Sequence, residues 1–174
     1  MATPKLRFKG YSDNWKLIKL EKDCTFFSGG TPTSTNKKYY QGEIPFIGSG
    51  NIYDDKVNSY INEDALNNSS AKLVEIGDIL YALYGANSGD VSISKIKGAI
   101  NQAILCIKPS SINKFFLMTI LSYNKDKIVS KYLQGGQGNL SSKIVKNLKF
   151  YFPLSSEQQK IATFLTAVDK RISL

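Results

Sequence analysis

Polar side chains that can hydrogen-bond to nucleic-acid bases gather in loop-like, often glycine-rich segments of this sequence. Asparagine and glutamine amides can pair with two atoms of adenine, lysine reaches guanine or phosphate, and tyrosine offers a flat ring and a hydroxyl. Each such residue can also be an ordinary turn residue, because Asn, Ser and Gly dominate turns for backbone reasons. As a set they favour base recognition, and the candidates are Lys37, Lys38, Tyr39, Tyr40, Asn51, Tyr84, Asn87, Ser88, Asn101, Gln102, Gln134, Gln137, Asn139 and Ser141.

Lysine is concentrated in one part of the chain. The whole sequence holds 23 basic and 14 acidic residues, a net charge of +9, and residues 91–149 hold ten lysines against a single acid, Asp126. This bias favours a polyanion as partner, although a lysine-rich solubilising surface would look the same. We expect lysines beside the loops to neutralise phosphates, namely Lys95, Lys97, Lys143 and Lys146.

Sequence signatures of catalysis are absent. The chain has no histidine, which excludes Ser-His-Asp and Cys-His catalysis and histidine-ligated metal sites. It contains neither a phosphate-binding G-x-x-x-x-G-K-[ST] loop nor the Asn-Pro-Pro-aromatic loop of amino-methyltransferases. The acidic pairs Asp54-Asp55 and Glu63-Asp64 are expected in solvated polar loops, and Asp78 in a turn after Gly77. We therefore expect a non-catalytic chain that binds no cofactor or metal itself.

Length and composition favour one soluble globular domain. The chain has 174 residues, of which 42% are hydrophobic and 21% charged. No apolar run approaches the ~18 residues that span a bilayer, and no secretion signal opens the chain. We accordingly expect a cytoplasmic location and no membrane partner. We therefore expect Cys24 and Cys106 to be reduced, buried thiols.

The elements that must position these side chains are mainly strands, with helices late in the chain. Hydrophobic patterning predicts a helical region over 113–133, as one broken or two short helices, and a helical turn over 141–147. Residues 52–72 are expected to be irregular. The arm 1–14 is expected to be ordered only where Leu6 and Phe8 pack. Strands are expected at 25–28, 44–47, 79–84, 91–96, 99–108 (one bent strand or a pair) and 148–152.

The last element is an amphipathic helix. Pro153 ends the preceding strand, and Ser155 with Gln158 matches an S-x-x-Q capping box. One apolar stripe follows and is still running when the sequence ends, so we expect a shortened gene product or a fragment of a longer helix. Such a stripe packs against a partner helix; its residues are Ile161, Phe164, Leu165, Val168 and Ile172.

Several stretches resemble one known family in their order and spacing. From Trp15 onward they are SGGTPTSTNKKYYQGEIPFIGSGNI (28–52), GDILYALYGANSGDVSI (77–93), INQAILCIKP (100–109) and QGNLSSKIVKNLKFYFPLSSEQQKIATFLTAVDKRI (137–172). The G-x-TP loop, the INQA strand and the EQ-x-x-IA helix start are together specific. The sequence is similar to a target recognition domain in the specificity subunit of type I restriction–modification systems.

The resemblance implies a division of labour. A full specificity subunit carries two recognition domains, each followed by a long helix, and each domain reads one half of a bipartite site through the DNA major groove. Modification subunits methylate adenine with S-adenosylmethionine, and restriction subunits use ATP and Mg to translocate and cleave DNA. The implied partners are double-stranded DNA, both kinds of subunit, and a second specificity half or a second copy of this chain.

We therefore expect an α+β fold with a mixed, mostly antiparallel sheet and peripheral helices. Its parts would be an arm (1–14), a target recognition domain (15–154) and the truncated start of a spacer helix (155–174). The expected function is sequence-specific DNA recognition in a bacterial type I complex. Two alternatives stay open: a half-length decoy or dimerisation module with little specific DNA binding, and a sequence-blind binder. The ratio of specific to nonspecific DNA affinity distinguishes a sequence-blind binder from the expected sequence-specific one.

Overall fold

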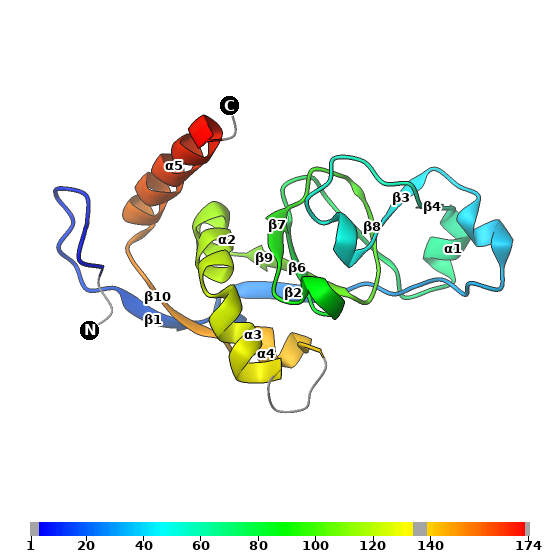
Figure 1. The fold of residues 1–174 in the computed structure, drawn as a ribbon, viewed down its shortest axis with the longest axis horizontal. Helices are drawn as coiled ribbons and strands as arrows, with labels where there is room; N and C mark the ends of the chain where they lie inside the picture. Colours follow the sequence, from blue (N-terminus) through cyan, green and yellow to red (C-terminus); the bar gives the residue numbers. More distant parts are fainter. Residues whose placement is uncertain (1–3, 134–138, 173–174) are drawn as a thin grey trace.

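The structure, a computed structural model, describes residues 4–133 and 139–172 and confirms an α+β fold (Figure 1). Its strands form three sheets. A two-stranded antiparallel ribbon pairs β1 (Lys16–Lys19) with β10 (Lys149–Phe152). A four-stranded sheet has the order β2 (Cys24–Ser28), β9 (Ile104–Pro109), β6 (Ile79–Ala82) and β7 (Val91–Ile93), with antiparallel neighbours.

The third sheet is mixed. Its order is β4 (Tyr60–Ile61), β3 (Ile44–Ile47), β8 (Gly98–Ile100) and β5 (Lys72–Val74). The strands β3 and β8 run parallel, whereas β4 and β5 pair antiparallel with their neighbours. The mostly antiparallel arrangement expected from the sequence is therefore confirmed.

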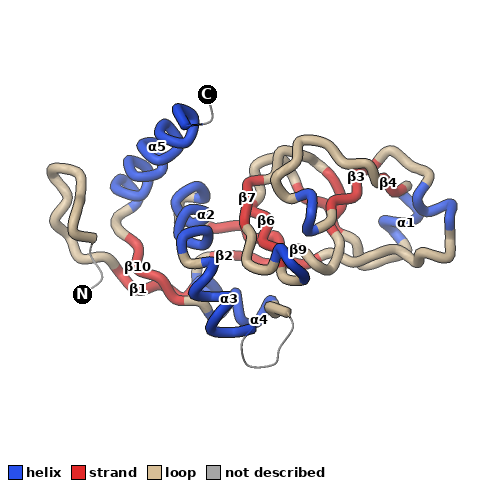
Figure 2. The backbone as a smooth tube through the Cα atoms, in the orientation of Figure 1, coloured by secondary structure: helices blue, strands red, loops and turns tan. Residues whose placement is uncertain are grey.

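Most of the α-helices lie toward one end of the molecule, whereas α1 (Glu63–Asn67) lies at the opposite end, beside β4 (Figure 2). The region 113–133, predicted as one broken helix or two short helices, contains two short helices. Short 3-10 turns lie at η1 (Leu20–Lys22), η2 (Lys37–Tyr40), η3 (Ser49–Asn51) and η4 (Gly85–Asn87). The α-helices are α1 (Glu63–Asn67), α2 (Lys114–Tyr123), α3 (Lys125–Leu133), α4 (Ser142–Asn147) and α5 (Ser155–Ile172).

The central sheet β2-β9-β6-β7 is covered on both faces. Tyr81 and Leu105 belong to the large core cluster that includes residues of α2, α3 and α4, whereas Leu80 and Ile104 belong to the cluster shared with the third sheet. Because successive side chains of a strand point to opposite faces, a sheet buried on both sides needs a continuous apolar run. This explains why every residue of β6 is buried.

The segment Gly29-Gly30-Thr31-Pro32 passes close to the third sheet. A Cβ at Gly29 would lie 1.7 Å from the backbone oxygen of Ile100, and one at Gly30 would lie 2.1 Å from Oγ of Ser70. Only glycine allows the backbone this approach. The glycine pair therefore lets the chain leave β2 in close contact with Ile100, at the end of β8, and with Ser70.

Several predicted boundaries need correction. The strand expected over 79–84 ends at Ala82, the one over 91–96 ends at Ile93, and 99–108 divides into β8 and β9, which belong to different sheets. The region 52–72, expected to be irregular, contains β4 and α1, and β5 begins at its end. It is anchored by buried apolar residues, among them Ile52, Val57, Ile61 and Ala65. Glu63 and Asp64 are exposed but lie in the first turn of α1 rather than in a loop.

The start of α5 also differs from the predicted capping box. Ser155 is already helical. Gln158 is buried, donates from Nε2 to the Pro153 oxygen over 3.0 Å, and accepts from the Asn113 backbone N–H over 2.9 Å. Its amide therefore connects α5 to the end of β10 and to the cap of α2. Gln158 does not form the predicted capping box with Ser155.

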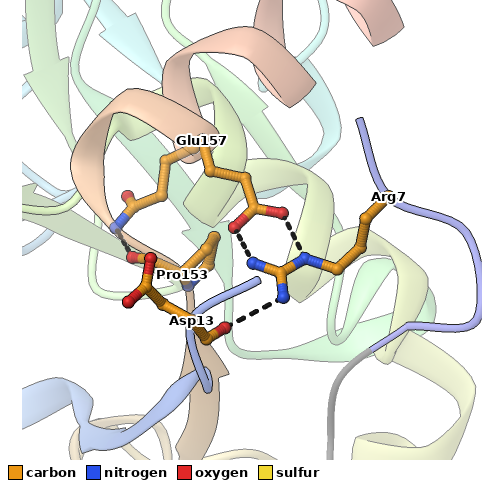
Figure 3. A network of polar contacts seen from close by, with 5 residues as sticks. Arg7, Asp13, Pro153 and Glu157 are labelled. Carbon is orange, nitrogen blue, oxygen red and sulfur yellow. Dashed lines mark hydrogen bonds and ion pairs between the residues drawn. The ribbon is translucent and has the colours of Figure 1, made fainter. Parts of the chain in front are cut away.

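The N-terminal arm is held by Arg7 rather than by Leu6. Leu6 is 90% exposed. Arg7 donates to both carboxylate oxygens of Glu157 and to the Asp13 backbone oxygen (Figure 3). Phe8 packs edge-on against Phe164, which confirms the packing predicted for Phe8. The arm thus lies against the first half of α5.

Other expectations from composition can be compared directly. Cys24 and Cys106 are both free and buried, which confirms the predicted reduced thiols. Burial raises the pKa of each thiol to about 12. Asp78 accepts from the Glu75 backbone N–H, which confirms its role in a turn, and its carboxylate pairs with Lys108. In the described part of the chain, no helix is long and apolar enough to cross a membrane.

Candidate nucleic-acid interface

Three of the polar segments selected from sequence meet in space. They are the turn after β3 (48–55), the turn after β6 (83–90) and the crossing from β8 to β9 (101–103). Asn87 Nδ2 donates to the Ser49 backbone oxygen over 3.3 Å, and the Asn101 backbone N–H donates to the Ile47 oxygen over 3.3 Å. We call Asn51, Asn87 and Asn101 the asparagine cluster.

The crossing at Asn101 explains why these loops converge. Because β8 belongs to the third sheet and β9 to the central sheet, the chain passes between sheets at residues 101–103. The side-chain oxygen of Asn101 accepts from the Ala103 backbone N–H over 3.0 Å and stabilises this turn. Gln102 is exposed beside it and accepts from the Thr31 hydroxyl over 2.5 Å. The crossing therefore presents two amides beside the glycine-rich loop.

The asparagine cluster uses part of its hydrogen-bonding capacity on its own loops. Asn51 accepts from the Gly48 backbone N–H and donates to Asp54, so both ends of its amide are engaged. Asn87 keeps its side-chain oxygen and Asn101 keeps its NH2 group, since no bond within the described chain uses them. A two-point contact with adenine needs both groups of one amide. In this conformation the cluster offers single donors and acceptors.

A charged network supports the turn after β6. Lys125 Nζ, at the start of α3, lies 2.5 Å from Oδ1 of Asp90, and this hydrogen bond raises the pKa of the lysine. Burial raises the pKa of Tyr53 as well, and Asp90 raises it further. Lys95 donates to the Tyr53 backbone oxygen over 2.8 Å. Lys95 therefore lies beside the turn after β3.

Two other members of the turn after β6 differ in exposure. Tyr84 is 37% exposed, whereas Ser88 is only 5% exposed. The Ser88 hydroxyl donates to the backbone oxygens of Leu83 and Gly85. The structure thus assigns Ser88 to the interior of the turn rather than to the exposed surface expected for a base contact.

The segment Lys37–Tyr40 lies apart from the asparagine cluster, beside α1 and β4. The Tyr40 hydroxyl donates to the Pro32 oxygen over 2.7 Å, and its ring packs edge-on against Phe46. Tyr39 packs against the small core around Ile61. Only the lysines, Lys37 and Lys38, are exposed here.

The remaining candidates lie near α4. Ser141 caps this helix by accepting from the Ile144 backbone N–H over 3.2 Å. Asn139 is exposed, and both groups of its amide are unused within the described chain. Gln134 and Gln137 lie outside the described residues. Leu140 N–H donates to the Leu83 oxygen over 2.9 Å, which ties this segment to the chain after β6.

Three of the four lysines predicted to contact phosphate interact within the chain, and Lys95 does so through its bond to the Tyr53 oxygen. Lys97 pairs with Glu75 at 3.1 Å on the third sheet. Lys146 lies 5.8 Å from the ring centre of Phe26, on α4. Lys143 is exposed on the same helix. The four lysines therefore do not share one surface. Lys143 and Lys146 lie on α4, Lys97 lies just before β8, and Lys95 lies beside the turn after β3.

The apolar stripe of α5 is only partly covered. Ile161 packs against the main core, together with the buried Ala162. Phe164 is 54% exposed despite its contact with Phe8, and Leu165 and Val168 are half-buried. The side chain of Ile172 lies outside the description. An apolar cavity of about 420 Å³ separates this face from the arm, lined by residues that include Trp15, Ile161 and Phe164.

Comparison with known proteins identifies the relatives of this sequence. Residues 12–174 match a family model described as the type I restriction modification DNA specificity domain. The chain is 30% identical over 172 residues to the MjaX type I specificity subunit of Methanocaldococcus jannaschii, covering 93% of this chain and 38% of that protein. It is 26% identical over 174 residues to the EcoR124I/EcoR124II specificity subunit of Escherichia coli, covering 94% and 43%.

Solved structures show the same fold. The HsdS subunit of Thermoanaerobacter tengcongensis superposes with a TM-score of 0.69 at 18% identity, covering 99% of this chain and 41% of that one. A chain from a study of assembly and conformational transition in a type I system gives 0.74 at 20% identity, covering 95% and 41%. The chain thus spans about two fifths of the length of these relatives.

Proposed function

This chain belongs to the type I restriction modification DNA specificity domain family, and on that premise we propose that it reads one half of a bipartite DNA site. Residues 15–154 would form the target recognition domain, and α5 would begin the spacer that joins it to a second specificity half. Modification subunits would methylate adenine at the site with S-adenosylmethionine. Restriction subunits would use ATP and Mg, so this chain would recognise DNA without catalysing a reaction.

The asparagine cluster is the observation that supports DNA reading most directly. It joins three loops, which come from two sheets, and it keeps the Asn87 oxygen and the Asn101 NH2 group unbonded within the described chain. Base edges in the major groove present both donors and acceptors, so an unbonded oxygen and an unbonded NH2 can each find a partner there. Asn139 adds a complete amide next to Leu140, whose N–H bonds the Leu83 oxygen. Together these groups would read bases while lysines hold the backbone.

The family also supports a prokaryotic, cytoplasmic role, since the relatives with named sources come from an archaeon and from bacteria. We propose that this chain acts on chromosomal DNA in the bacterial cytoplasm. The half-exposed Phe164 on α5 favours a second candidate function, in which the chain mainly occupies partner subunits as a decoy. The two functions differ in whether the chain determines which bases are methylated.

Methylome sequencing of the host separates them. Strains would carry either the intact gene or an Asn101→Ala/Asn139→Ala variant, with Ser156→Glu on α5 as a control outside the loops. We expect one half of a bipartite methyladenine motif to change in the double variant and to persist in the control. An unchanged motif in the double variant would exclude these loops as the reader, and a chain whose deletion changes no motif would be a decoy.

A further inference from the structure

A positively charged surface lies on the side of α3 that faces away from the turn after β6. Here a groove of about 570 Å³ runs between α3 and β10. Lys127 and Lys131 line it from α3, and Lys149 lines it from β10. Tyr132, Tyr151 and Asn147 also line it, and no acidic residue does. None of these three lysines was singled out by the loop-based sequence argument.

The lysines of this groove are available for a partner. All three are exposed, and among the described residues none of them forms an ion pair. Lys131 only lies over the ring of Tyr132, at 5.2 Å. Elsewhere in the molecule, Lys97, Lys108 and Lys125 each pair with a carboxylate. The nearby acid Asp126 does not line the groove, and Glu21 is paired with Lys19 at 2.6 Å.

Electrostatic repulsion within the groove points to a polyanion. Lys127 and Lys131 are one helical turn apart, so their Cβ atoms lie about 5–6 Å from each other. Lys149 lines the same groove from β10 and adds a third positive charge. An anion with several charges would relieve this repulsion. The groove has no arginine fork and is open, which suits repeated phosphates better than one small, tightly held anion.

The position of α3 links this groove to the reading loops. On its other side, Lys125 pairs with Asp90, and Val129 contacts Gly89 so closely that a Cβ at Gly89 would lie 2.8 Å from Cγ2 of Val129. One rigid helix thus carries the base-reading turn on one side and the unpaired lysines on the other. A strand of DNA held in the groove would lie within one helix diameter, about 10–12 Å, of that turn.

We propose that the groove between α3 and β10 binds the sugar–phosphate backbone of duplex DNA and sets the register at which the loops meet the bases. This inference rests on the proposed DNA-reading function and adds the surface that anchors it. Lys127, Lys131 and Lys149 supply the charge, and the hydroxyl of Tyr151, a 41% exposed residue, and the Asn147 amide add neutral contacts to phosphate oxygens. Because lysine contacts to phosphate carry no sequence information, the groove contributes affinity rather than specificity.

The test is the salt dependence of binding by the full chain to a mixed-sequence 30-base-pair duplex. Each lysine–phosphate contact contributes about 0.9 to the slope of log K against log salt. The variant Lys127→Gln/Lys131→Gln/Lys149→Gln should therefore lower the slope by about 2 to 3. Lys9→Gln/Lys16→Gln/Lys72→Gln removes the same charge from exposed lysines elsewhere and should change the slope much less.

One further variant makes the outcome decisive. Arginine at the same three positions keeps the charge, so it should preserve the slope and show that a loss is not caused by misfolding. If the glutamine variant keeps the slope of its control, or changes base preference at constant slope, the proposal is wrong. Failure of the proposed function would look different: the unaltered chain would bind every duplex equally, whatever the groove variants did.

Discussion

Arg7 and Glu157 are 150 positions apart in the chain and form a two-point ion pair where α5 begins. The donor atoms Nε and Nη2 of Arg7 lie 2.9 and 2.6 Å from the two carboxylate oxygens. The same guanidinium donates from Nη1 to the Asp13 oxygen over 2.9 Å. Glu157 is 1% exposed, so its charge depends on this one partner for compensation. The pair therefore joins the arm to the base of α5 (Figure 3).

We predict that Arg7→Leu lowers the melting temperature more than the double change Arg7→Leu/Glu157→Leu. Losing the arginine alone leaves a buried carboxylate without a counter-charge, whereas losing both leaves apolar groups. Arg7→Lys should recover only part of the loss, because lysine cannot make the two-point contact. Thermal unfolding, monitored by circular dichroism, measures the melting temperatures of the variants and so their order of stability. A double variant less stable than Arg7→Leu would show that the pair does not hold the arm.

The elements that sequence predicted best are those whose residues face the core. The strand expected over 44–47 matches β3 at both ends, and the helical region expected over 113–133 appears as α2 and α3. Their apolar spacing is set by local geometry, so it is readable without knowledge of the fold. The candidate loops after β3 and β6 also proved to be neighbours, although their meeting depends on strand order, which spacing does not reveal.

The errors arose where distant contacts decide local structure. The region 52–72 looks polar because its apolar residues are few and scattered among polar ones, yet Ile52 and Ile61 fill positions in a core made largely by other segments. Gln158 matched a capping box, but Asn113 and Pro153 take up its amide. The lysines of the α3-β10 groove were missed because the sequence argument followed the loops, whereas a helix and a strand supply these lysines.

The turn after β6 gives a second prediction, at Gly89. This residue has a φ of +87°, and a Cβ there would lie 2.8 Å from Val129 and 3.0 Å from Lys125. Gly85 has a φ of +76° but nothing within 4 Å of such a Cβ. Gly85→Ala should cost about 1–2 kcal/mol of unfolding free energy from backbone strain alone. Gly89→Ala should cost more, because it also displaces α3. Equal costs in urea unfolding would contradict the contact.

Asn139 and Lys143 should behave differently in DNA binding. Asn139 offers a whole amide, and losing one good two-point base contact costs about 1–3 kcal/mol for one sequence. Lys143 is a flexible charge on α4, so Lys143→Ala should weaken binding to all duplexes alike and lower the salt slope by about 0.9. We expect Asn139→Ala, and equally Gln137→Ala, to alter preference at one base position. Binding selection from a random duplex pool measures base preference and overall affinity together. A change of base preference in the Lys143→Ala variant would show that Lys143 contacts a base rather than phosphate.

The partly covered stripe of α5 predicts an assembly contact. Leu165→Glu would place a charge on the half-buried face and should abolish association with a partner helix without unfolding residues 15–152. Ser156→Glu adds the same charge to the exposed first turn of α5, where it suits the helix dipole, and should leave association intact. Light scattering of the chain, alone and with modification subunits, reports the change. Normal assembly by the Leu165→Glu variant would exclude this face.

The buried thiols predict how stability depends on pH. The pKa of Cys24 and that of Cys106 rise from 9.0 to about 12, chiefly because burial disfavours the thiolate. The folded state therefore holds its thiol protons to higher pH than the unfolded state does. Their contribution is complete below pH 9.0 and is lost as pH rises from there to about 12, by at most ~1.4 kcal/mol per pH unit for each thiol. We expect Cys24→Ala/Cys106→Ala to flatten the fall in urea-unfolding free energy between about pH 8 and about pH 10 relative to the unaltered chain. An equal fall in both proteins would place the alkaline sensitivity in other groups, with the lysines first among them.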